Sequence, residues 1–586
     1  MIFSEEDYTL VEKILLGDGH FNNLQREFIE LFETRTIIAG PGAGKTTTLA
    51  AKIILLLKQL NKNNSKEGVC IITYTNVAVN EINNTLQKAG IGVLTHPHFI
   101  GTIHEFFNKF CLIPFFKKEY NNSSFFFAED HPTDKKFYEN YYSRNFPWMN
   151  EGVKSSIAQR TCESDLIFDS VTGKIDIENT GNWDEDKFLK HKSKMLDAKM
   201  ARKKLGFLYY EDTFLFSKVF LRNSKYQDIL RKRFKYIFID EFQDTTMSGT
   251  ELIKEIFNSN NVLQMIGDPY QTIMYDQQMP KVDEHSVFRL NLSNRFGSEI
   301  SRHLNIIMPE ANIQTPQEKR SFDPVILLYD DEKDIYPTYK LIIREYEEQN
   351  STFKTCKKRD KVLVWNKNWT PKIKVGVAYS NKKLKNLETK NNLLKHLVSD
   401  FVCNRVRNPN ENLSTLKEWI SKHQKKMLLH AILLELLKMG ISVERKRKLK
   451  DLINELLLEK GADTINLRSS LFKDIEDILS SPNVKVEVED EGAEDIFTIH
   501  SVKGETLRSV LVVNFNGGPL TDILFHRYGV IKERNYRYTD HNLLYVAMSR
   551  VTHLFVFALH QKLWSKEVQS TFQENWTVKD TGLIKI

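Results

Sequence analysis

The stretch TRTIIAGPGAGKTTTLAAKIILLLKQL, Thr34 to Leu60, decides the fold of this chain. It begins as a short apolar run, passes through a glycine-rich turn and continues with apolar residues at helical spacing. That order predicts a buried strand, a phosphate-binding loop and a helix. Gly40, Gly42 and Gly44 allow backbone N–H groups to close around phosphate oxygens at the positive end of the helix. The segment therefore predicts an α/β domain with an anion-binding loop.

The same loop carries side chains suited to a nucleotide and its metal. Lys45 is placed to reach the β- and γ-phosphates of ATP, and the Thr46 hydroxyl is placed to bind Mg²⁺. Ala39 stands where the usual pattern has its first glycine, a change that leaves the cradle intact. We therefore expect ATP and Mg²⁺ as ligands. The expected nucleotide-binding residues of the loop are Gly40, Pro41, Gly42, Ala43, Gly44, Lys45, Thr46 and Thr47.

A second stretch, YIFIDEFQDTT from Tyr236 to Thr246, runs an apolar strand into a cluster of acids. In P-loop NTPases a second strand delivers an aspartate to the Mg²⁺ shell, and Asp240 lies where this strand ends. Glu241 is then placed to accept a proton from the attacking water. Acids at a strand end also serve as simple helix caps. The phosphate-binding loop favours the catalytic interpretation, with Lys45 as the cationic partner.

The DEFQD segment resembles that of the UvrD-like superfamily 1 DNA helicases, and further motifs of that family follow in its order. The matching segments are FNNLQREF, TYTNVAVNEI, GTIHEFF, GFLYYEDTFLF, MIGDPYQTIM, LNLSNRFGSEI, FTIHSVKGETLRSVLVV and NLLYVAMSR. They extend from Gln25 to Arg550 and so cover most of the chain. The resemblance implies an ATP-hydrolysing DNA helicase.

The resemblance also implies roles for single residues. Gln25 would recognise adenine and Gln271 would sense the γ-phosphate. Arg295 and Arg550 would stabilise the transition state from a second lobe. Taken singly, such arginines are more often surface or ion-paired residues, so the order of the motifs carries these assignments. The implied catalytic set is Lys45, Asp240, Glu241, Gln271, Arg295 and Arg550, the metal ligands are Thr46 and Asp240, and the DNA contacts are Thr75, Asn76, His104, Tyr275 and His500.

Three motifs depart from the family pattern. The segment QTIMYDQQMP lacks the usual arginine and has Tyr275 as its nearest aromatic residue. SNRF puts Asn294 where a ring that stacks on adenine is expected, and KGET moves the acid to Glu505. None of these changes removes a hydrolytic residue, so they bear on coupling to DNA. Gln243 and Asp244 are not required for hydrolysis in general, and we expect them to link the γ-phosphate site to the cleft between the lobes.

Short apolar strands alternate with helical segments, which predicts parallel sheets covered by helices. We expect strands at 68–75, 236–241 and 262–268 in a first sheet, and at 324–329, 360–365, 509–515 and 552–559 in a second. The expected fold is α/β, and the resemblance implies two RecA-like P-loop NTPase lobes with mainly helical insertions. The expected domains are lobe 1A at 1–104 and 202–290, insertion 1B at 105–201, lobe 2A at 291–384 and 486–586, and helical insertion 2B at 385–485.

The composition is that of a globular protein, with 41% apolar and 27% charged residues and a net charge of +7. No apolar run approaches the roughly 18 residues of a membrane-spanning helix, so we expect a cytoplasmic protein without membrane contact. The cysteines show no spacing typical of zinc or iron–sulfur sites and are expected to be reduced thiols. The mild positive charge is compatible with DNA binding and does not demonstrate it.

The resemblance implies 3′–5′ movement on single-stranded or tailed duplex DNA, in repair or in antiphage defence. The compact size and short second insertion are similar to the helicase-like subunit of the Gabija antiphage system, which implies a nuclease partner. A second hypothesis is a regulatory ATPase that senses DNA ends and unwinds little. A fused helicase–nuclease is disfavoured because only a short stretch follows Arg550 and the insertions contain no Asp…Glu-x-Lys set.

Overall fold

The computed structural model describes residues 3–92, 94–128, 134–180, 182–273, 286–374, 390–406, 416, 419–420, 423, 425–480 and 495–582. The chain divides into two compact units, Met1–Ile373 with Asp495–Ile586, and Lys374–Glu494. None of the helices among the described residues combines the length and the hydropathy needed to cross a bilayer.

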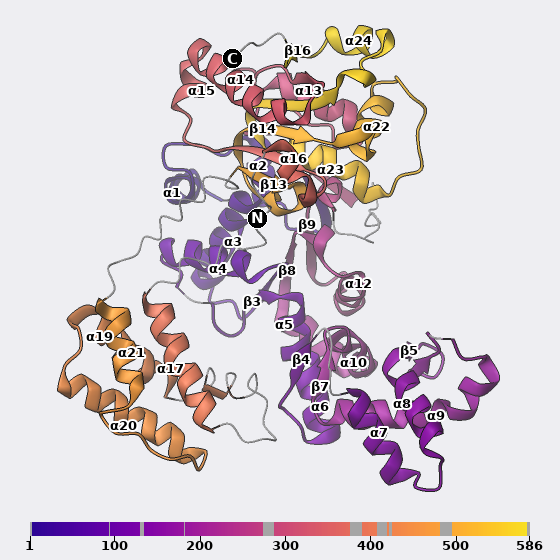
Figure 1. Ribbon diagram of the computed structural model, residues 1–586, viewed down its shortest axis with the longest axis vertical. Helices are drawn as coiled ribbons and strands as arrows, with labels where there is room; N and C mark the ends of the chain where they lie inside the picture. Colours follow the sequence, from indigo (N-terminus) through magenta and orange to yellow (C-terminus); the bar gives the residue numbers. More distant parts are fainter. Residues whose placement is uncertain are drawn as a thin grey trace. The chain divides into compact units, whose positions relative to one another are not determined.

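The first unit contains a six-stranded parallel sheet built around the phosphate-binding loop (Figure 1). Its strands lie in the order β10-β1-β9-β8-β2-β3. Their bounds are β1 Arg35–Ala39, β2 Gly68–Thr73, β3 Phe99–Thr102, β8 Phe234–Asp240, β9 Val262–Gly267 and β10 Val287–Leu290. Strand β9 pairs with both β1 and β8. Because the carboxyl ends of parallel strands share one edge, the loop after β1 and the acids after β8 lie at the same edge.

This lobe contains helices both with and without a side-chain cap at their start. They are α1 Glu5–Leu15, α2 Asn23–Glu30, α3 Lys45–Lys62, α4 Asn76–Lys88, α5 Ile103–Phe107, α10 Asp212–Leu221, α11 Ser224–Arg233 and α12 Met247–Ile256. At the start of α2, Asn22 and Gln25 form a reciprocal capping box. The helix α3 follows Gly44, whose φ of 77° lies in the left-handed region that glycine adopts without strain. Buried apolar residues of α3 such as Leu49 and Ile53 pack against Ile37 of β1.

A mixed segment interrupts the first lobe. It contains the π-helix η1 Asn108–Leu112, the helices α6 Ile113–Tyr120, α7 Asp134–Asn145, α8 Glu151–Glu163 and α9 Glu185–Lys204, and the strands β4 Phe126–Ala128, β5 Asp165–Asp169, β6 Lys174–Glu178 and β7 Phe207–Tyr209. Strands β5 and β6 form an antiparallel hairpin, whereas β4 pairs with β7 in parallel. Tyr138, Ile157 and Met195 contribute to a separate small core of this segment.

A second six-stranded parallel sheet has the order β13-β12-β14-β15-β11-β16. The strands are β11 Val325–Tyr329, β12 Asp360–Val364, β13 Ile496–Thr498, β14 Leu507–Val513, β15 Val551–His560 and β16 Thr577–Asp580. The helices beside them are α13 Ser298–Ile307, α14 Ile335–Gln349, α15 Ser351–Thr355, α16 Thr370–Ile373, α22 Pro519–Arg527, α23 Tyr538–Met548 and α24 Lys566–Gln573. The segments before and after the second compact unit thus contribute strands to one sheet.

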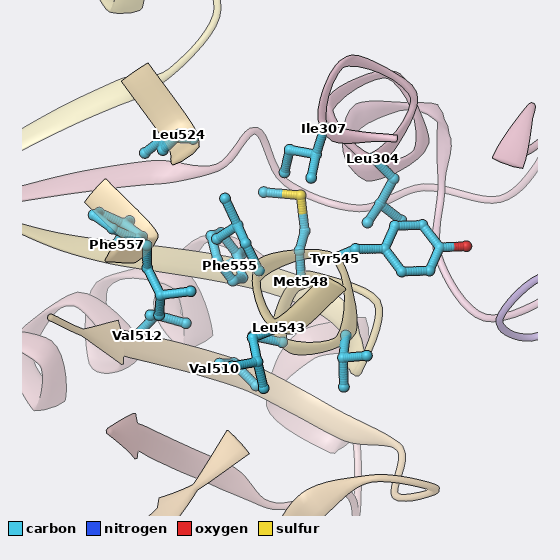
Figure 2. Packing of buried hydrophobic residues seen from close by; sticks show 14 of the residues in the cluster. Leu304, Ile307, Val510, Val512, Leu524, Leu543, Tyr545, Met548, Phe555 and Phe557 are labelled. Atoms are coloured by element: carbon cyan, nitrogen blue, oxygen red, sulfur yellow. The ribbon is translucent and has the colours of Figure 1, made fainter. Parts of the chain in front are cut away.

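Helix α23 packs onto this second sheet, and Ser549 and Arg550 follow its last residue. Figure 2 shows Leu543 and Met548 of α23 among Val510, Val512 and Phe555 of the sheet. The same core cluster includes Ile38, Tyr270 and Ile273, which belong to the first lobe. The apolar contacts therefore hold the end of α23 close to the edge of the first sheet where β9 ends.

The second compact unit is a set of helices with its own core. Its described helices are α17 Lys390–Val406, α19 Lys426–Met439, α20 Val443–Glu459 and α21 Ser470–Ser480. Val398, Leu433, Leu452 and Ile475 are among the buried residues of that core. This unit is consistent with the apolar spacing that predicts helices in the 385–485 segment.

The expected fold class is confirmed: two parallel sheets are covered by helices. Each of the seven expected strand segments forms a strand, in the expected sheet. The sequence did not reveal the β5–β6 hairpin inside the 105–201 segment, because those strands are short and flanked by charged residues.

Candidate active site

Neighbouring elements hold the carbonyl groups of the phosphate-binding loop. The Ser293 hydroxyl donates to the Pro41 carbonyl oxygen at 2.7 Å, and the Asn294 N–H donates to the Gly42 carbonyl oxygen at 2.9 Å. A Cβ at position 42 would lie 2.5 Å from the Arg295 Cβ, and the φ of Gly42 is 79°. Glycine is therefore required there on both grounds. The link between β10 and α13 shapes the loop from outside.

Gln25 closes the other side of the loop. Its Nε2 donates to the Ala43 carbonyl oxygen at 2.9 Å, and its Oε1 accepts from the Asn22 N–H at 3.0 Å. Because an N–H can only donate and a carbonyl can only accept, these partners settle which way the amide faces. One further N–H and one further lone pair remain on the Gln25 amide. This N–H and this lone pair together complement the N7 acceptor and the N6 amino donor of adenine.

Lys45 and the acids after β8 form the charged centre of the site. The Lys45 Nζ lies 3.4 Å from Asp240 Oδ1 and also pairs with Glu241 Oε1. Burial raises the pKa of Asp240, and the nearby Lys45 only partly offsets this effect. Burial also opposes ionisation of Glu241, but the Lys45 ammonium outweighs it and lowers the pKa of Glu241. The two carboxylates in turn outweigh burial and raise the pKa of Lys45.

Glu241 has an unusual backbone conformation. Its φ of 52° is in the left-handed region, where few residues with a side chain are found. The Gln243 Nε2 donates to Glu241 Oε2 at 2.5 Å, and the Gln243 Oε1 accepts from the Asp268 N–H at 3.1 Å. A Cβ at Gly267 would come within 2.0 Å of that Gln243 oxygen. Gln243 thus orients Glu241 and joins the end of β8 to the end of β9.

Asp268 and Gln271 connect the first lobe to α23. The Gln271 Nε2 donates to Asp268 Oδ2 at 2.8 Å, and the Arg550 guanidinium donates to Gln271 Oε1 at 2.7 Å. The Tyr545 hydroxyl donates to Asp268 Oδ2 at 3.3 Å. Arg550 is 2% exposed, and burial lowers its pKa although Asp268 acts in the opposite direction. A chain of hydrogen bonds therefore crosses from one sheet to the other beside Lys45.

Asp268 predicts a dependence of stability on pH. Burial raises the pKa of Asp268 to about 6, from an ordinary value of 3.8. The folded protein therefore holds this proton more tightly than the unfolded chain. The resulting stability is fully present below about pH 4 and is lost as the pH rises through 6. Between these pH values the wild-type protein should lose up to about 3 kcal/mol in the free energy of unfolding through Asp268. Asp268→Asn cannot ionise at this position and should not show that loss.

Denaturant unfolding at about pH 4 and pH 7.5, in buffer without metal or nucleotide, measures this difference. The exposed Asp18 provides a matched control, because Asp18→Asn should change the stability equally at both pH values. Equal changes for Asp268→Asn at the two pH values would contradict the prediction.

Arg295 approaches the same site from the β10–α13 link. Its guanidinium donates to the Ser549 carbonyl oxygen at 2.7 Å, next to Arg550. Burial and the neighbouring Arg550 lower the pKa of Arg295 to about 9. Among the residues that the structure describes, no acid forms a salt bridge with Arg295 or Arg550, and two such arginines held close together are suited to an anion with several charges.

The structure brings together all six residues of the expected catalytic set. Lys45, Asp240 and Glu241 are in direct contact, and Asp268 joins this cluster to Gln271 and Arg550. Thr46 and Thr47 lie in the first turn of α3, directly after Lys45. The Thr46 hydroxyl and Asp240 carboxylate are oxygen ligands of the kind that Mg²⁺ prefers, so the donor set fits this ion.

A salt bridge links the acidic stretch to the second sheet. Lys503 Nζ lies 2.7 Å from Asp244 Oδ1 and 2.8 Å from Oδ2. Asp244 is 6% exposed, and burial raises its pKa in opposition to Lys503. Glu505 does not take part in this bridge. It pairs instead with Lys361 of β12 at 2.7 Å, within the second lobe.

The expected DNA contacts occupy several places. Thr75 caps α4 and accepts from the Ala78 N–H at 3.2 Å, and Asn76 is exposed beside it. His104 packs 4.7 Å from the Phe214 ring, and burial lowers its pKa. His500 is exposed, and its Nε2 donates to the Ile273 carbonyl oxygen at 3.0 Å. Tyr275 lies outside the described residues.

The lysine-rich run after Lys354 contains two tryptophans that pack inward. Trp365 lies against the core that contains Leu363, and Trp369 lies 5.2 Å from the ring of Phe515. These contacts favour a packing role over a row of rings for stacking bases.

Sequence reasoning missed Asp268, Ser293, Tyr545 and Ser549. Asp268 could have been found, because it follows the strand that neighbours the Asp240 strand. Carboxyl-terminal ends of such strands gather functional residues. The roles of Ser293 and Ser549 depend on a backbone carbonyl or a hydroxyl, and nothing in their local sequence marks them.

Comparison with known proteins shows which helicases the first part of this chain is similar to. The model of the UvrD/REP helicase N-terminal domain matches residues 21–276. This part of the chain is similar to a UvrD/REP helicase N-terminal domain and makes up less than half of the chain. The match begins just before Gln25 and includes the phosphate-binding loop, the acidic stretch and Gln271. The residues after 276, including Arg295 and Arg550, lie beyond the matched UvrD/REP domain.

Curated relatives match about half of the chain or less. The ATP-dependent DNA helicase Rep of Buchnera aphidicola subsp. Schizaphis graminum is 27% identical over 267 residues, which are 42% of this chain and 37% of the relative. A probable DNA helicase II homolog of Mycoplasma capricolum is 25% identical, covering 46% of this chain and 36% of its own length. The Gabija protein GajB of Bacillus cereus is 23% identical, covering 50% of each chain. The chain thus spans half or less of the length of these relatives.

Proposed function

We propose that this protein is an ATP- and Mg²⁺-dependent DNA helicase or translocase that moves 3′ to 5′ on single-stranded DNA. The observation that carries the proposal is the chain from Lys45 and Glu241 through Gln271 to Arg550, which runs from the first sheet to the second. Similarity to helicases named Rep supports the choice of DNA as the substrate.

In the proposed reaction the residues of the loop bind ATP, and the acids after β8 activate water and hold the metal. Loop N–H groups and Lys45 bind the phosphates of ATP, while Glu241 accepts a proton from the water that attacks the γ-phosphorus. Arg295 and Arg550 stabilise the negative charge that develops on the transferred group. Thr46 and Asp240 would hold Mg²⁺, which neutralises phosphate charge when bound. Gln25 would select adenine through its remaining donor and acceptor.

The contacts between the sheets provide a route from hydrolysis to movement. Arg550 on the second lobe contacts Gln271 on the first, and Lys503 contacts Asp244 in the same way. A change in charge at the γ-phosphate position would alter the balance of both contacts. ATP binding would then draw the lobes together and hydrolysis would release them, which is the two-state behaviour that a translocase needs.

The Asp244–Lys503 salt bridge is expected to couple DNA binding to the rate of ATP hydrolysis. Asp244→Asn and Lys503→Met should each lower the DNA-stimulated rate of ATP hydrolysis about tenfold more than the unstimulated rate. A hydrogen-bonded charge pair of this kind contributes about 1.5–3 kcal/mol. Because both substitutions break one contact, the double variant should be little worse than either single variant. Steady-state ATPase assays with and without single-stranded DNA measure these rates.

Lys361→Met is the matched control for that cycle. It breaks a lysine–glutamate pair of the same 2.7 Å length inside the second lobe, and so should leave the ratio of stimulated to unstimulated rates unchanged. Additive losses in the Asp244→Asn, Lys503→Met double variant would argue against a role for this contact in transmission.

Strand displacement on tailed duplexes tests the function itself. We expect ATP-dependent displacement of a duplex with a 3′ single-stranded tail and much less with a 5′ tail. ATP hydrolysis that is indifferent to single-stranded DNA would overturn the motor proposal. Because Gln25 complements adenine and guanine offers only acceptors at the same edge, ATP should be preferred to GTP.

A second candidate function is a DNA-sensing regulatory ATPase that acts with a nuclease subunit in antiphage defence. The similarity to a Gabija protein over half of both chains favours it. This candidate predicts ATP hydrolysis that DNA ends stimulate, with no displacement from either tailed duplex. Purification from the native host, followed by identification of the proteins that accompany it, tests for the partner.

A further inference from the structure

Lys52 is a buried lysine with no role in the site described above. It lies on α3 about two helical turns beyond Lys45, and it is 0% exposed. Its Nζ donates to the Phe28 carbonyl oxygen at 2.7 Å and also to the Leu31 carbonyl oxygen. The rings of Phe28 and Phe32 lie 4.6 and 4.4 Å from the same nitrogen. Burial lowers the pKa of Lys52, and no acidic neighbour among the described residues offsets this effect.

An ammonium group without an acidic partner is costly to bury, so its surroundings must compensate. Here the compensation comes from the end of α2, where the Phe28 carbonyl, which also accepts from the Leu31 N–H, and the Leu31 carbonyl both accept from Lys52. A cation is favoured at that end by the helix dipole, and the faces of the two phenylalanine rings add to the attraction. Lys52 therefore attaches the C-terminal end of α2 to the helix that carries Lys45.

A second buried side chain reinforces this attachment. Gln264 of β9 is 0% exposed, and its Nε2 donates to the Leu31 carbonyl oxygen at 2.9 Å and to the Glu33 carbonyl oxygen at 3.0 Å. At the opposite end of α2, the Gln25 amide donates to Ala43 in the phosphate-binding loop. The helix is thus held at both ends by elements that also shape the loop.

We propose that Lys52 is a positioning residue that sets the place of the Gln25 amide and so controls which nucleotide base is accepted. The inference rests on the proposed function, in which Gln25 reads adenine. Two hydrogen bonds to a base require the amide to be held within about 0.5 Å of its proper place. The helix α2 spans only eight residues, so a shift at its C-terminal end moves Gln25 as well.

The test uses Lys52→Met in the full-length protein, which keeps the length of the side chain and removes its donor. We expect the KM for ATP to rise about tenfold while kcat changes less than about twofold. The ratio of kcat/KM for ATP to that for GTP should fall about tenfold. Lys58→Met is the matched control on the same helix, since Lys58 is only half-buried and lies 3.4 Å from Asp7 Oδ1; it should leave all three values unchanged.

Gln264→Leu gives a second and milder test in case Lys52→Met does not fold. It removes the other donor to Leu31 and should raise the KM for ATP about threefold, with a fall in the ATP-to-GTP ratio. A folded variant of either kind with an unchanged ratio overturns the inference, because a purely structural lysine would affect both nucleotides alike. Wild-type protein that hydrolyses neither nucleotide, or both equally, would instead overturn the proposed function.

Discussion

Lys45→Ala is expected to lower the rate of ATP hydrolysis at least about a thousandfold. A single positioned donor to developing charge is worth about 10²–10³ in rate, and Lys45 adds a full positive charge to that role. In the structure the Lys45 ammonium lies against both Asp240 and Glu241, at the start of the helix that follows the loop. Its loss removes the cation that faces the phosphates and leaves two acids together without a partner.

The same variant should also lose stability in a manner that depends on pH. Removing one partner of a buried ion pair costs about 3–5 kcal/mol, because the remaining charge is buried and uncompensated. Asp240 is 3% exposed, so protonation is its main relief. The loss in melting temperature should therefore be smaller at about pH 5 than at pH 8.

Lys62→Ala is the matched control, since Lys62 is an exposed residue in the last turn of the same helix. It should hydrolyse ATP at the wild-type rate and melt at nearly the wild-type temperature. ATP hydrolysis by Lys45→Ala at the wild-type rate would contradict the proposed mechanism.

Glu241→Gln should abolish hydrolysis while ATP still binds. A general base contributes about 10²–10⁴ in rate, and glutamine has the same shape without the ability to take a proton. The Gln243 Nε2 can still donate to the new amide oxygen, so the local geometry at the strained φ of 52° should persist. Lys45 remains available to the phosphates. We therefore expect kcat to fall by that factor and the Kd for ATP to change little.

Single-turnover hydrolysis and equilibrium binding of a fluorescent ATP analogue separate these two quantities. Glu255→Gln, an exposed acid on α12, is the control that should leave both unchanged. If Glu241→Gln lost ATP binding together with hydrolysis, Glu241 would be a residue that holds the site together and not its base.

Much of the hydrolytic half of the site was predictable because its residues lie in contiguous stretches. Gly40 to Thr47 and Asp240 to Asp244 each form one local motif at a strand end, and parallel strands bring such ends to one edge. Asp244 was expected to link the γ-phosphate site to the cleft between the lobes. In the structure this link is a salt bridge to Lys503, which lies far away in the sequence. The sequence could point to Lys503 only through the resemblance to the helicase family.

Other parts of the site could not be predicted from local sequence. Ser549 and Ala43 act through backbone carbonyl groups that any residue supplies, and Ser293 acts through a hydroxyl whose partner, Pro41, lies far away in the sequence. Glu505 was expected to bear on DNA coupling, yet its contact is with Lys361 inside the second lobe. Such pairings depend on how strands are ordered within a sheet, and a short stretch of sequence does not reveal that order.

The sequence by itself determined the phosphate-binding loop, the acids that face it and the two parallel sheets, because glycine spacing, strand periodicity and charge at strand ends act over a few residues. Only the tertiary structure decided what surrounds them. Packing of α23 between the sheets places Arg550 on Gln271, and the burial of Lys52 against α2 connects the loop helix to Gln25. These contacts join residues distant in the chain, and their energies exist only once the core has formed.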